Sequence, residues 1–119
     1  MKYMLLIHSN PEAWAKLSTA DQEAMMAGYW TFTEKIQASG ELVAGDPLEG
    51  PDTATTVRVR GGSRATTDGP FVETKEHLAG YYVVDCVDLD RAIALAAEIP
   101  DAATGGVEVR PIADMGPTA

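Results

Sequence analysis

The chain begins with an apolar segment that is typical of a β-strand covered on both faces. An extended strand points alternate side chains to opposite sides. Here both sides are apolar: Tyr3, Leu5 and Ile7 on one, Met4 and Leu6 on the other. The Asn10-Pro11 pair is expected to stop the strand. Strands with two apolar faces are buried between layers, so we expect cover on both sides of this one.

A long amphipathic helix is predicted over residues 19–39. Ser18 is its expected N-cap, with Asp21 in the first turn. Gly40 follows at the position of a left-handed C-cap residue. Apolar residues recur every three or four positions along one face, namely Met25, Tyr29, Phe32 and Ile36. Such a stripe is typical of a helix that packs on a sheet.

The middle of the chain predicts a hairpin. Residues 55–60 alternate between two kinds of side chain, with Thr55, Val57 and Val59 expected inward and Arg58 and Arg60 outward. Gly61-Gly62 suits a tight turn. The expected return strand spans residues 63–67. The hairpin is thus expected to place one apolar face against the rest of the domain.

The remaining elements complete two β-α-β units. Short strands are predicted over residues 41–45, 79–86 and 107–112. A second helix is expected to start after Asp88, a good N-cap, and to end at Pro100. Its predicted buried stripe is Leu89, Ala92, Ile93 and Ala96. Residues 1–112 therefore form one expected domain, and residues 113–119 an expected flexible C-terminal tail.

This order of elements predicts an α+β fold, a ferredoxin-like split βαβ domain with an inserted β-hairpin. In that plan both helices cover one face of the sheet, yet the first strand is apolar on both sides. A second copy of the sheet is the simplest cover for the other face. We therefore expect a homodimer that packs through its sheet faces, of the dimeric α/β-barrel type.

Composition narrows the class of protein. The chain has 119 residues and a formal net charge of −9, which argues against direct binding to nucleic acid and against docking on an anionic membrane. No segment approaches the ~20 apolar residues that a membrane span needs. Cys86 is the one cysteine, which excludes an intrachain disulfide and fits a reducing cytoplasm. We expect a cytoplasmic protein and an inert, buried thiol.

The strongest candidate for chemistry is a polar cluster at residues 66–76. Asp68 is the candidate catalytic acid or base, since the neighbouring ring of Phe71 would desolvate its carboxyl group and raise the pKa. Phe71, Glu73 and Lys75 are candidate ligand-binding residues, with Phe71 as the floor of the pocket and Lys75 as an anion anchor. The alternative is a structural loop, in which Asp68 bonds to backbone N–H groups and Phe71 anchors the loop in the core.

Three further residues are candidates outside that cluster. His8, at the end of the first strand, is a candidate proton shuttle, because histidine titrates near neutrality. Asp46 and Trp30 are candidate ligand-binding residues, although aromatic residues such as Trp30 belong more often to the core. His8 and His77 stand alone, so no metal-ligand spacing is present, and no phosphate-cradling glycine motif is found. We expect no metal and no cofactor.

The Asp68-Gly69-Pro70-Phe71 tetrapeptide resembles the signature of the DGPF-domain branch of the YCII-related family. The resemblance extends over residues 1 to about 112, through Leu42-Val43-Ala44-Gly45, Phe71-Val72-Glu73-Thr74-Lys75-Glu76 and Gly80-Tyr81-Tyr82-Val83-Val84-Asp85. It implies a ferredoxin-like dimer. It also implies a regulatory link to an extracytoplasmic-function sigma factor, since DGPF-type proteins are often encoded beside one.

Broader relatives in that family carry a His-Asp pair in a cleft, with the histidine on the first helix. This chain has no histidine between Asp21 and Gly40, and Gly28-Tyr29 occupies the matching region. The pair cannot be carried over, and tyrosine, with an ordinary pKa near 10, is a poor base. The sequence therefore favours a homodimeric module that binds a small molecule or a regulatory partner. The alternative is a cofactor-free enzyme that uses acid-base chemistry around Asp68.

Overall fold

A four-stranded antiparallel sheet forms the body of the molecule. The computed structural model describes residues 1–72 and 74–115. The strands of the sheet lie in the order β2 (Leu42–Pro47), β5 (His77–Asp85), β1 (Lys2–Ser9) and β6 (Gly106–Pro111). The two central strands come from different β-α-β units, so the units interleave. This α+β arrangement is compatible with the predicted ferredoxin-like fold.

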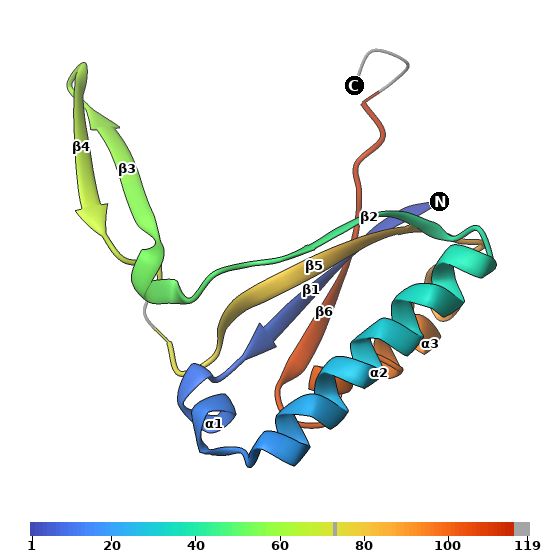
Figure 1. The fold of residues 1–119 in the computed structure, drawn as a ribbon. Coiled ribbons are helices and arrows are strands. Elements are labelled where there is room, and N and C mark those ends of the chain that lie inside the picture. The colour runs from blue at the N-terminus through green and yellow to red at the C-terminus, as the bar shows by residue number, and fades with distance from the viewer. Residues whose placement is uncertain (73, 116–119) are drawn as a thin grey trace.

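Two helices, α2 (Thr19–Ala38) and α3 (Leu89–Ala97), cover the same face of the sheet (Figure 1). Both predicted N-caps are confirmed: the Ser18 hydroxyl accepts from the Asp21 N–H at 3.1 Å, and the Asp88 carboxylate accepts from the Arg91 N–H at 2.9 Å. The core between helices and sheet consists of Tyr3, Leu5, Ile7, Phe32, Ile36, Val84, Cys86, Ala92, Leu95, Ala96 and Ile99.

The predicted stripe of the second helix is partly wrong. Leu89 and Ile93 are exposed, at 45% and 50%, whereas Leu95, which the prediction left out, is fully buried. The helix packs on β6 and β1 through the face that carries Ala92, Leu95 and Ala96. Both stripes of this helix are apolar, so periodicity alone could not choose between them.

The sequence also missed the short helix α1 (Pro11–Lys16). The Asn10-Pro11 pair ends the strand as predicted, and it also starts a helix. The Asn10 side chain accepts from the Glu12 N–H at 2.9 Å, and Pro11 occupies the first helical position, where no N–H is needed. Two short 3₁₀ turns, η1 (Pro51–Thr53) and η2 (Pro100–Ala102), were likewise not predicted.

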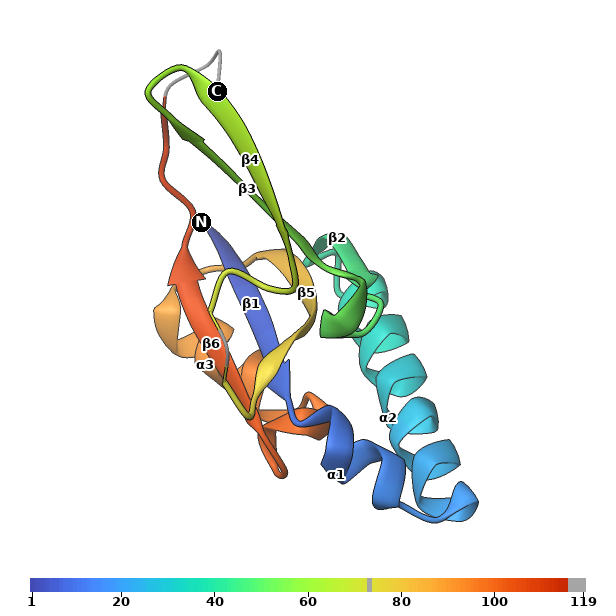
Figure 2. The same ribbon diagram turned by 90° about the vertical axis from the view of Figure 1, so that its left-hand side faces the viewer.

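The predicted hairpin forms, but not in the expected environment. Strands β3 (Thr55–Arg60) and β4 (Ser63–Asp68) pair only with each other, as a separate two-stranded sheet that projects from the body (Figures 1 and 2). Val57 and Val59, predicted to point inward, are 57% and 59% exposed. That prediction is wrong because the hairpin, here called the arm (residues 55–68), pairs with no other described strand and leaves both valines exposed.

The face of the sheet opposite the helices has no cover from any described helix. The register pairs Met4 with Val83 and Leu6 with Tyr81, which places these four side chains on that face. All four are only half-buried. We call this surface the open face. It corresponds to the second apolar side of the first strand.

The C-terminal segment follows β6 without regular structure as far as Met115, and residues 116–119 lie outside the described residues. The predicted domain limits and flexible tail stay predictions. Among the described helices, none combines the length and the apolar character needed to cross a bilayer.

A candidate ligand cavity

A cavity of about 970 Å³ opens between residues 21–33 of α2 and the edge of the main sheet. Its walls come from the end of β1, from α1, from this part of α2, and from residues 45–51, 77–82 and 101–104. This volume lies at the upper end of the range for small-molecule sites. Both tryptophans of the chain, Trp14 and Trp30, line it.

The apolar stripe of α2 explains where the core ends and the cavity begins. Phe32 and Ile36, in the second half of the helix, are buried at 2% and 0% exposure and pack in the core. Met25 and Tyr29 continue the same stripe but are only half-buried, and both line the cavity. One predicted stripe therefore serves as core at one end and as a binding wall at the other.

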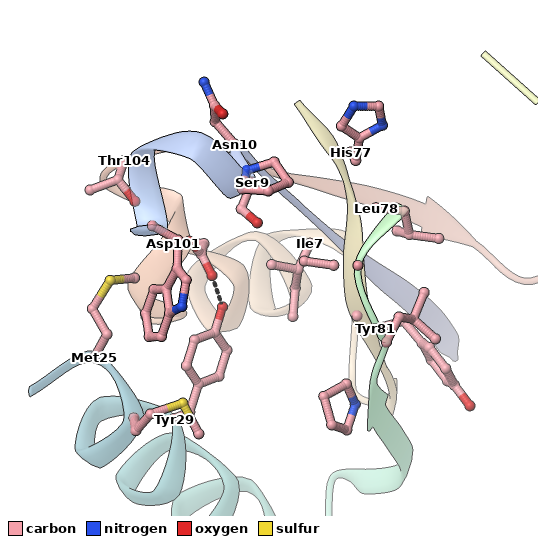
Figure 3. A pocket seen from close by; sticks show the side chains of 18 of the residues that line it. Ile7, Ser9, Asn10, Met25, Tyr29, His77, Leu78, Tyr81, Asp101 and Thr104 are labelled. Atoms are coloured by element: carbon pink, nitrogen blue, oxygen red, sulfur yellow. Dashed lines mark hydrogen bonds between the residues drawn. The ribbon is translucent and has the colours of Figure 1, made fainter. Parts of the chain in front are cut away.

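A hydrogen bond between Tyr29 and Asp101 lies inside the cavity (Figure 3). The Tyr29 hydroxyl donates to the Asp101 carboxylate. Gly28 allows this approach, since a Cβ atom there would lie 2.9 Å from Cγ of Pro100, the residue before Asp101. Burial, and then the bond to Asp101, raises the pKa of Tyr29 far above its ordinary value. The phenol thus stays protonated and holds the carboxylate in place.

The hydroxyl groups of Thr33 and Tyr82 form a second hydrogen-bonded pair in the cavity lining. The Thr33 hydroxyl donates to the Tyr29 carbonyl at 2.8 Å, so its 2.6 Å contact with Tyr82 has the Tyr82 hydroxyl as donor. The Tyr82 ring also packs edge-on against Phe32, with ring centroids 5.1 Å apart. A Cβ atom on Gly45 would lie 2.6 Å from the Tyr82 ring, so only glycine fits there. These three contacts position the Tyr82 ring in the cavity wall.

The other polar side chains that line the cavity include Ser9, His77 and Thr104. None of the three makes a side-chain hydrogen bond to another described residue. Figure 3 shows Ser9, Asp101 and Thr104 on the same side of the cavity, across from the apolar Met25 on α2. The cavity therefore has a polar side, with free hydroxyl groups, and an apolar side.

Two of the predicted ligand-binding residues, Trp30 and Asp46, line this cavity. Asp46 lies opposite Tyr81 in the β2–β5 ladder and accepts from the Tyr81 hydroxyl at 2.8 Å. That bond is the main cause of a raised Tyr81 pKa. Tyr81 belongs to the open face, and Figure 3 shows its ring directed away from Tyr29 and Asp101. The Asp46 carboxylate is thus engaged at the rim.

His8 lies on the open face, outside the cavity lining. Its Nε2 atom is 3.4 Å from Oε1 of Glu108 on the neighbouring strand β6. Strand β5 separates β1 from β2, so the structure does not bring His8 to Asp46. A role as proton shuttle stays a prediction without support from this geometry.

The predicted cluster around Asp68 is separate from the cavity. Asp68 ends β4 on the arm and is exposed, and Lys75 is also exposed. Phe71 was expected to form the floor of a pocket or, in a structural loop, to reach the core. It is instead 70% exposed, and the Arg58 guanidinium lies 4.7 Å from its ring centroid. None of these three lines the cavity, and Glu73 lies outside the described residues.

Two hydrogen bonds to the backbone of Gly69 hold the turn after Asp68 to the base of the arm. The Gly69 N–H donates to the Ala54 carbonyl at 2.7 Å, and the Thr56 hydroxyl donates to the Gly69 carbonyl at 2.9 Å. Gly69 has φ = 105°, a conformation that favours glycine. The motif thus fits a structural turn. Its Asp68 carboxylate makes no side-chain hydrogen bond to a described residue, so the loop uses backbone bonds instead.

Comparison with known proteins adds the family. The family model described as the YCII-related domain matches residues 1–116. The chain belongs to the YCII-related family. It is 34% identical over 115 residues to an uncharacterised protein of Rhizobium meliloti (strain 1021), with 95% of this chain and 93% of that protein covered.

The fold of this YCII-related chain is also similar to a solved structure. That structure is the 5-chloro-2-hydroxyhydroquinone dehydrochlorinase of Burkholderia phenoliruptrix AC1100 in complex with 2,5-dihydroxybenzoquinone. The TM-score is 0.57, with 95% and 94% of the two chains covered and 12% sequence identity. At that identity the likeness shows the fold alone.

The Tyr29–Asp101 pair of this YCII-related chain was not found from the sequence. The two residues are 72 positions apart, and η2, which carries Asp101, has no periodic signal. The one local sign is a small residue, Gly28, directly before Tyr29. Among the described residues, no three His, Cys, Asp or Glu side chains gather as metal ligands would.

Proposed function

We propose that the protein binds a small hydroxylated aromatic molecule in the cavity beside α2. One observation carries the proposal: a cavity of about 970 Å³, largely apolar, with the Tyr29–Asp101 hydrogen bond inside it. Small-molecule sites combine apolar walls with a few placed polar groups in this way.

Each side of the cavity matches one part of such a ligand. Trp14, Trp30 and Met25 offer surfaces on which an aromatic ring can stack. Asp101 is an acceptor for a ligand hydroxyl, and Ser9 can donate to a keto or phenolate oxygen. The dehydrochlorinase with a similar fold was solved with a dihydroxybenzoquinone, which supports this ligand class.

Calorimetric titration with 2,5-dihydroxybenzoquinone tests the proposal. We expect saturable binding at one site per chain, with a dissociation constant in the micromolar range. Tyr29→Phe keeps the ring but releases Asp101, and should weaken binding about tenfold, or about 1.4 kcal/mol. Tyr3→Phe is the matched control, because Tyr3 lies in the core outside the cavity. No heat of binding with this probe and a panel of catechols and hydroquinones would contradict the proposal.

A second candidate function is catalysis at the same place. The sequence predicts a cofactor-free acid-base enzyme around Asp68, but Asp68 does not line the cavity, whereas Asp101 lines it and bonds to Tyr29. Asp101 would accept a proton from a bound phenol, while Tyr29 orients it. Chloride release from 5-chloro-2-hydroxyhydroquinone tests this candidate. Turnover by the wild type that is lost in Asp101→Asn favours an enzyme, and binding without turnover favours a binding module.

We also propose that two copies pack through their open faces, in the manner of a dimeric α/β barrel. The support is the uncovered set of half-buried apolar side chains on that face: Met4, Leu6, Tyr81 and Val83. A stable dimer would remove this surface from water. Sedimentation velocity at micromolar concentration should give a dimer. A clean monomer would contradict this part of the proposal.

The finer family assignment rests on the Asp68-Gly69-Pro70-Phe71 turn, which supports placement in the DGPF branch. That branch suggests a regulatory link to an extracytoplasmic-function sigma factor, and the acidic surface would then contact the partner. Co-purification of a sigma factor with the tagged chain, lost at high salt, is the expected result. A cytoplasmic location accords with the buried free thiol of Cys86.

A further inference from the structure

The arm contributes no residue to the lining of the cavity. Every residue of β3 and β4 is exposed except Thr56, which is half-buried. The two strands contact each other far more than any other element. An isolated two-stranded hairpin is marginally stable in water. An arm of this length therefore needs something to pack on.

The dimensions of the molecule reflect this projection. The radius of gyration is 16.4 Å. A compact domain of this length would have about 13.5 Å. Figures 1 and 2 show the arm extending away from the body rather than folding back on it. Within the part of the chain that the structure describes, the arm thus joins no other sheet.

The arm carries a charge opposite to that of the body. Its three arginines, Arg58, Arg60 and Arg64, and one aspartate, Asp68, give a net charge of +2. Since the whole chain has a net charge of −9, the remaining residues have −11. None of the three arginines forms a salt bridge with a described residue. The arm is thus complementary to the body of another copy.

The two faces of the arm differ. The register pairs Val57 with Thr66 and Val59 with Arg64, so these four side chains share one face. This face offers two exposed valines beside a free arginine. Exposed apolar strands are a liability for aggregation unless something covers them. The face that carries Ala65 lies on the other side.

We propose that the arm docks on a second copy of this chain, with the Val57–Val59 face buried against the partner and Arg64, which shares that face, on acidic body surface. This inference rests on the proposed dimer. Figure 1 shows the arm on the side of the sheet away from the helices, where a copy packed on the open face would sit. In a two-fold dimer the arm of each chain would pack on the body of the other, so the arm–body contact would occur twice.

Sedimentation equilibrium of two matched double variants tests the inference. Val57→Asp/Val59→Asp places two acids on the docking face, and Ala65→Asp/Thr67→Asp places two on the opposite face. All four positions are exposed, so both variants should keep the circular dichroism spectrum of the body. We expect the first variant to raise the dimer dissociation constant at least tenfold, and the second to change it less than threefold.

Further measurements separate this inference from the proposed function. Raising the salt concentration should also weaken the wild-type dimer, since opposite charges meet in it. The emission maximum of an environment-sensitive fluorophore attached to the cysteine of Val59→Cys should shift to the blue as the protein concentration rises. If the wild type is a dimer and Val57→Asp/Val59→Asp dimerises equally well, the arm inference fails while the dimer through the open face stands. A monomeric wild type overturns both, and quinone binding is measured independently of either.

Discussion

The body and the arm are built from similar strand patterns, yet their burial is opposite. In the body, Leu5, Ile36 and Leu95 have no exposed surface, because two helices cover one face of the sheet. In the arm, Val57 and Val59 alternate with arginines just as regularly and remain more than half exposed. Alternation thus predicts a strand but not its cover. The body has a buried core of its own, whereas the arm leaves its valines exposed and, in our proposal, is covered by a second copy.

Truncation of one apolar side chain in each region should give the largest difference. Leu5→Ala leaves a cavity in the core and should lower the free energy of unfolding by about 3 kcal/mol. Val57→Ala in the dilute monomer should cost less than about 0.5 kcal/mol. Urea unfolding followed by circular dichroism measures both. Equal losses of unfolding free energy in the two variants would contradict the difference in burial between the body and the arm.

The pH dependence of stability should come from the body. The Glu41 carboxylate accepts two hydrogen bonds from the Arg91 guanidinium, at 2.8 and 2.9 Å, which join the start of β2 to α3. Arg91, and more weakly Ser39, lower the Glu41 pKa to about 2 against the opposing effect of burial. A carboxyl whose pKa is lowered on folding stabilises the protein above its unfolded pKa and loses that stabilisation as the pH falls.

We therefore expect roughly 2 kcal/mol of stability to disappear between about pH 4.5 and pH 2, a value reduced to allow for the partial exposure of Arg91. Glu41→Gln should flatten the curve of unfolding free energy against pH in that window. Asp68→Asn, an exposed carboxyl group of the arm, should leave the curve as in the wild type. A flat wild-type curve would contradict the assignment.

Local rules recovered most of the elements from the sequence. The limits of β3 and the N-caps Ser18 and Asp88 were predicted correctly, because caps and alternation are properties of neighbouring residues. Two errors share one cause. The Val57–Val59 face and the α3 stripe were oriented as if any apolar face must meet the core, whereas long-range packing decides which face is covered.

The candidate site was less accessible to the same reasoning. Trp30 and Asp46 were chosen and do line the cavity, but Asp68, Phe71 and Lys75 do not. The sequence concentrates polar residues there, and the structure uses the segment as a turn at the base of the arm. The Tyr29–Asp101 pair forms only when η2 packs against α2. Residues 72 positions apart show no sequence pattern that predicts such a contact.

Two glycine substitutions, one in the body and one in the arm, should have smaller effects that differ between the two regions. Gly28→Ala would bring a Cβ atom within 2.9 Å of Pro100 Cγ, so η2 must shift and Asp101 with it. Because alanine also favours the helix by up to about 1 kcal/mol, stability should change little. Binding of 2,5-dihydroxybenzoquinone should nevertheless weaken several-fold by calorimetry.

Gly62→Ala is the counterpart in the arm. Gly62 has φ = 78° in the hairpin turn, so alanine is strained there even though nothing lies within 4 Å of its Cβ. We expect it to loosen the hairpin by about 1 kcal/mol and to leave quinone binding unchanged. Equal effects of the two substitutions on binding would mean that the cavity does not depend on the contact between η2 and α2.

The central claim is that the body holds the ligand while the arm holds a second chain. Amide hydrogen exchange tests it directly, with two changes of condition. Adding 2,5-dihydroxybenzoquinone should slow exchange in residues 21–33 of α2 and near residues 101–105, and leave the arm unchanged. Raising the protein concentration through the dimer range should slow exchange in residues 55–68. Arm amides that exchange equally fast at all concentrations, or that respond to the quinone instead, would contradict the account.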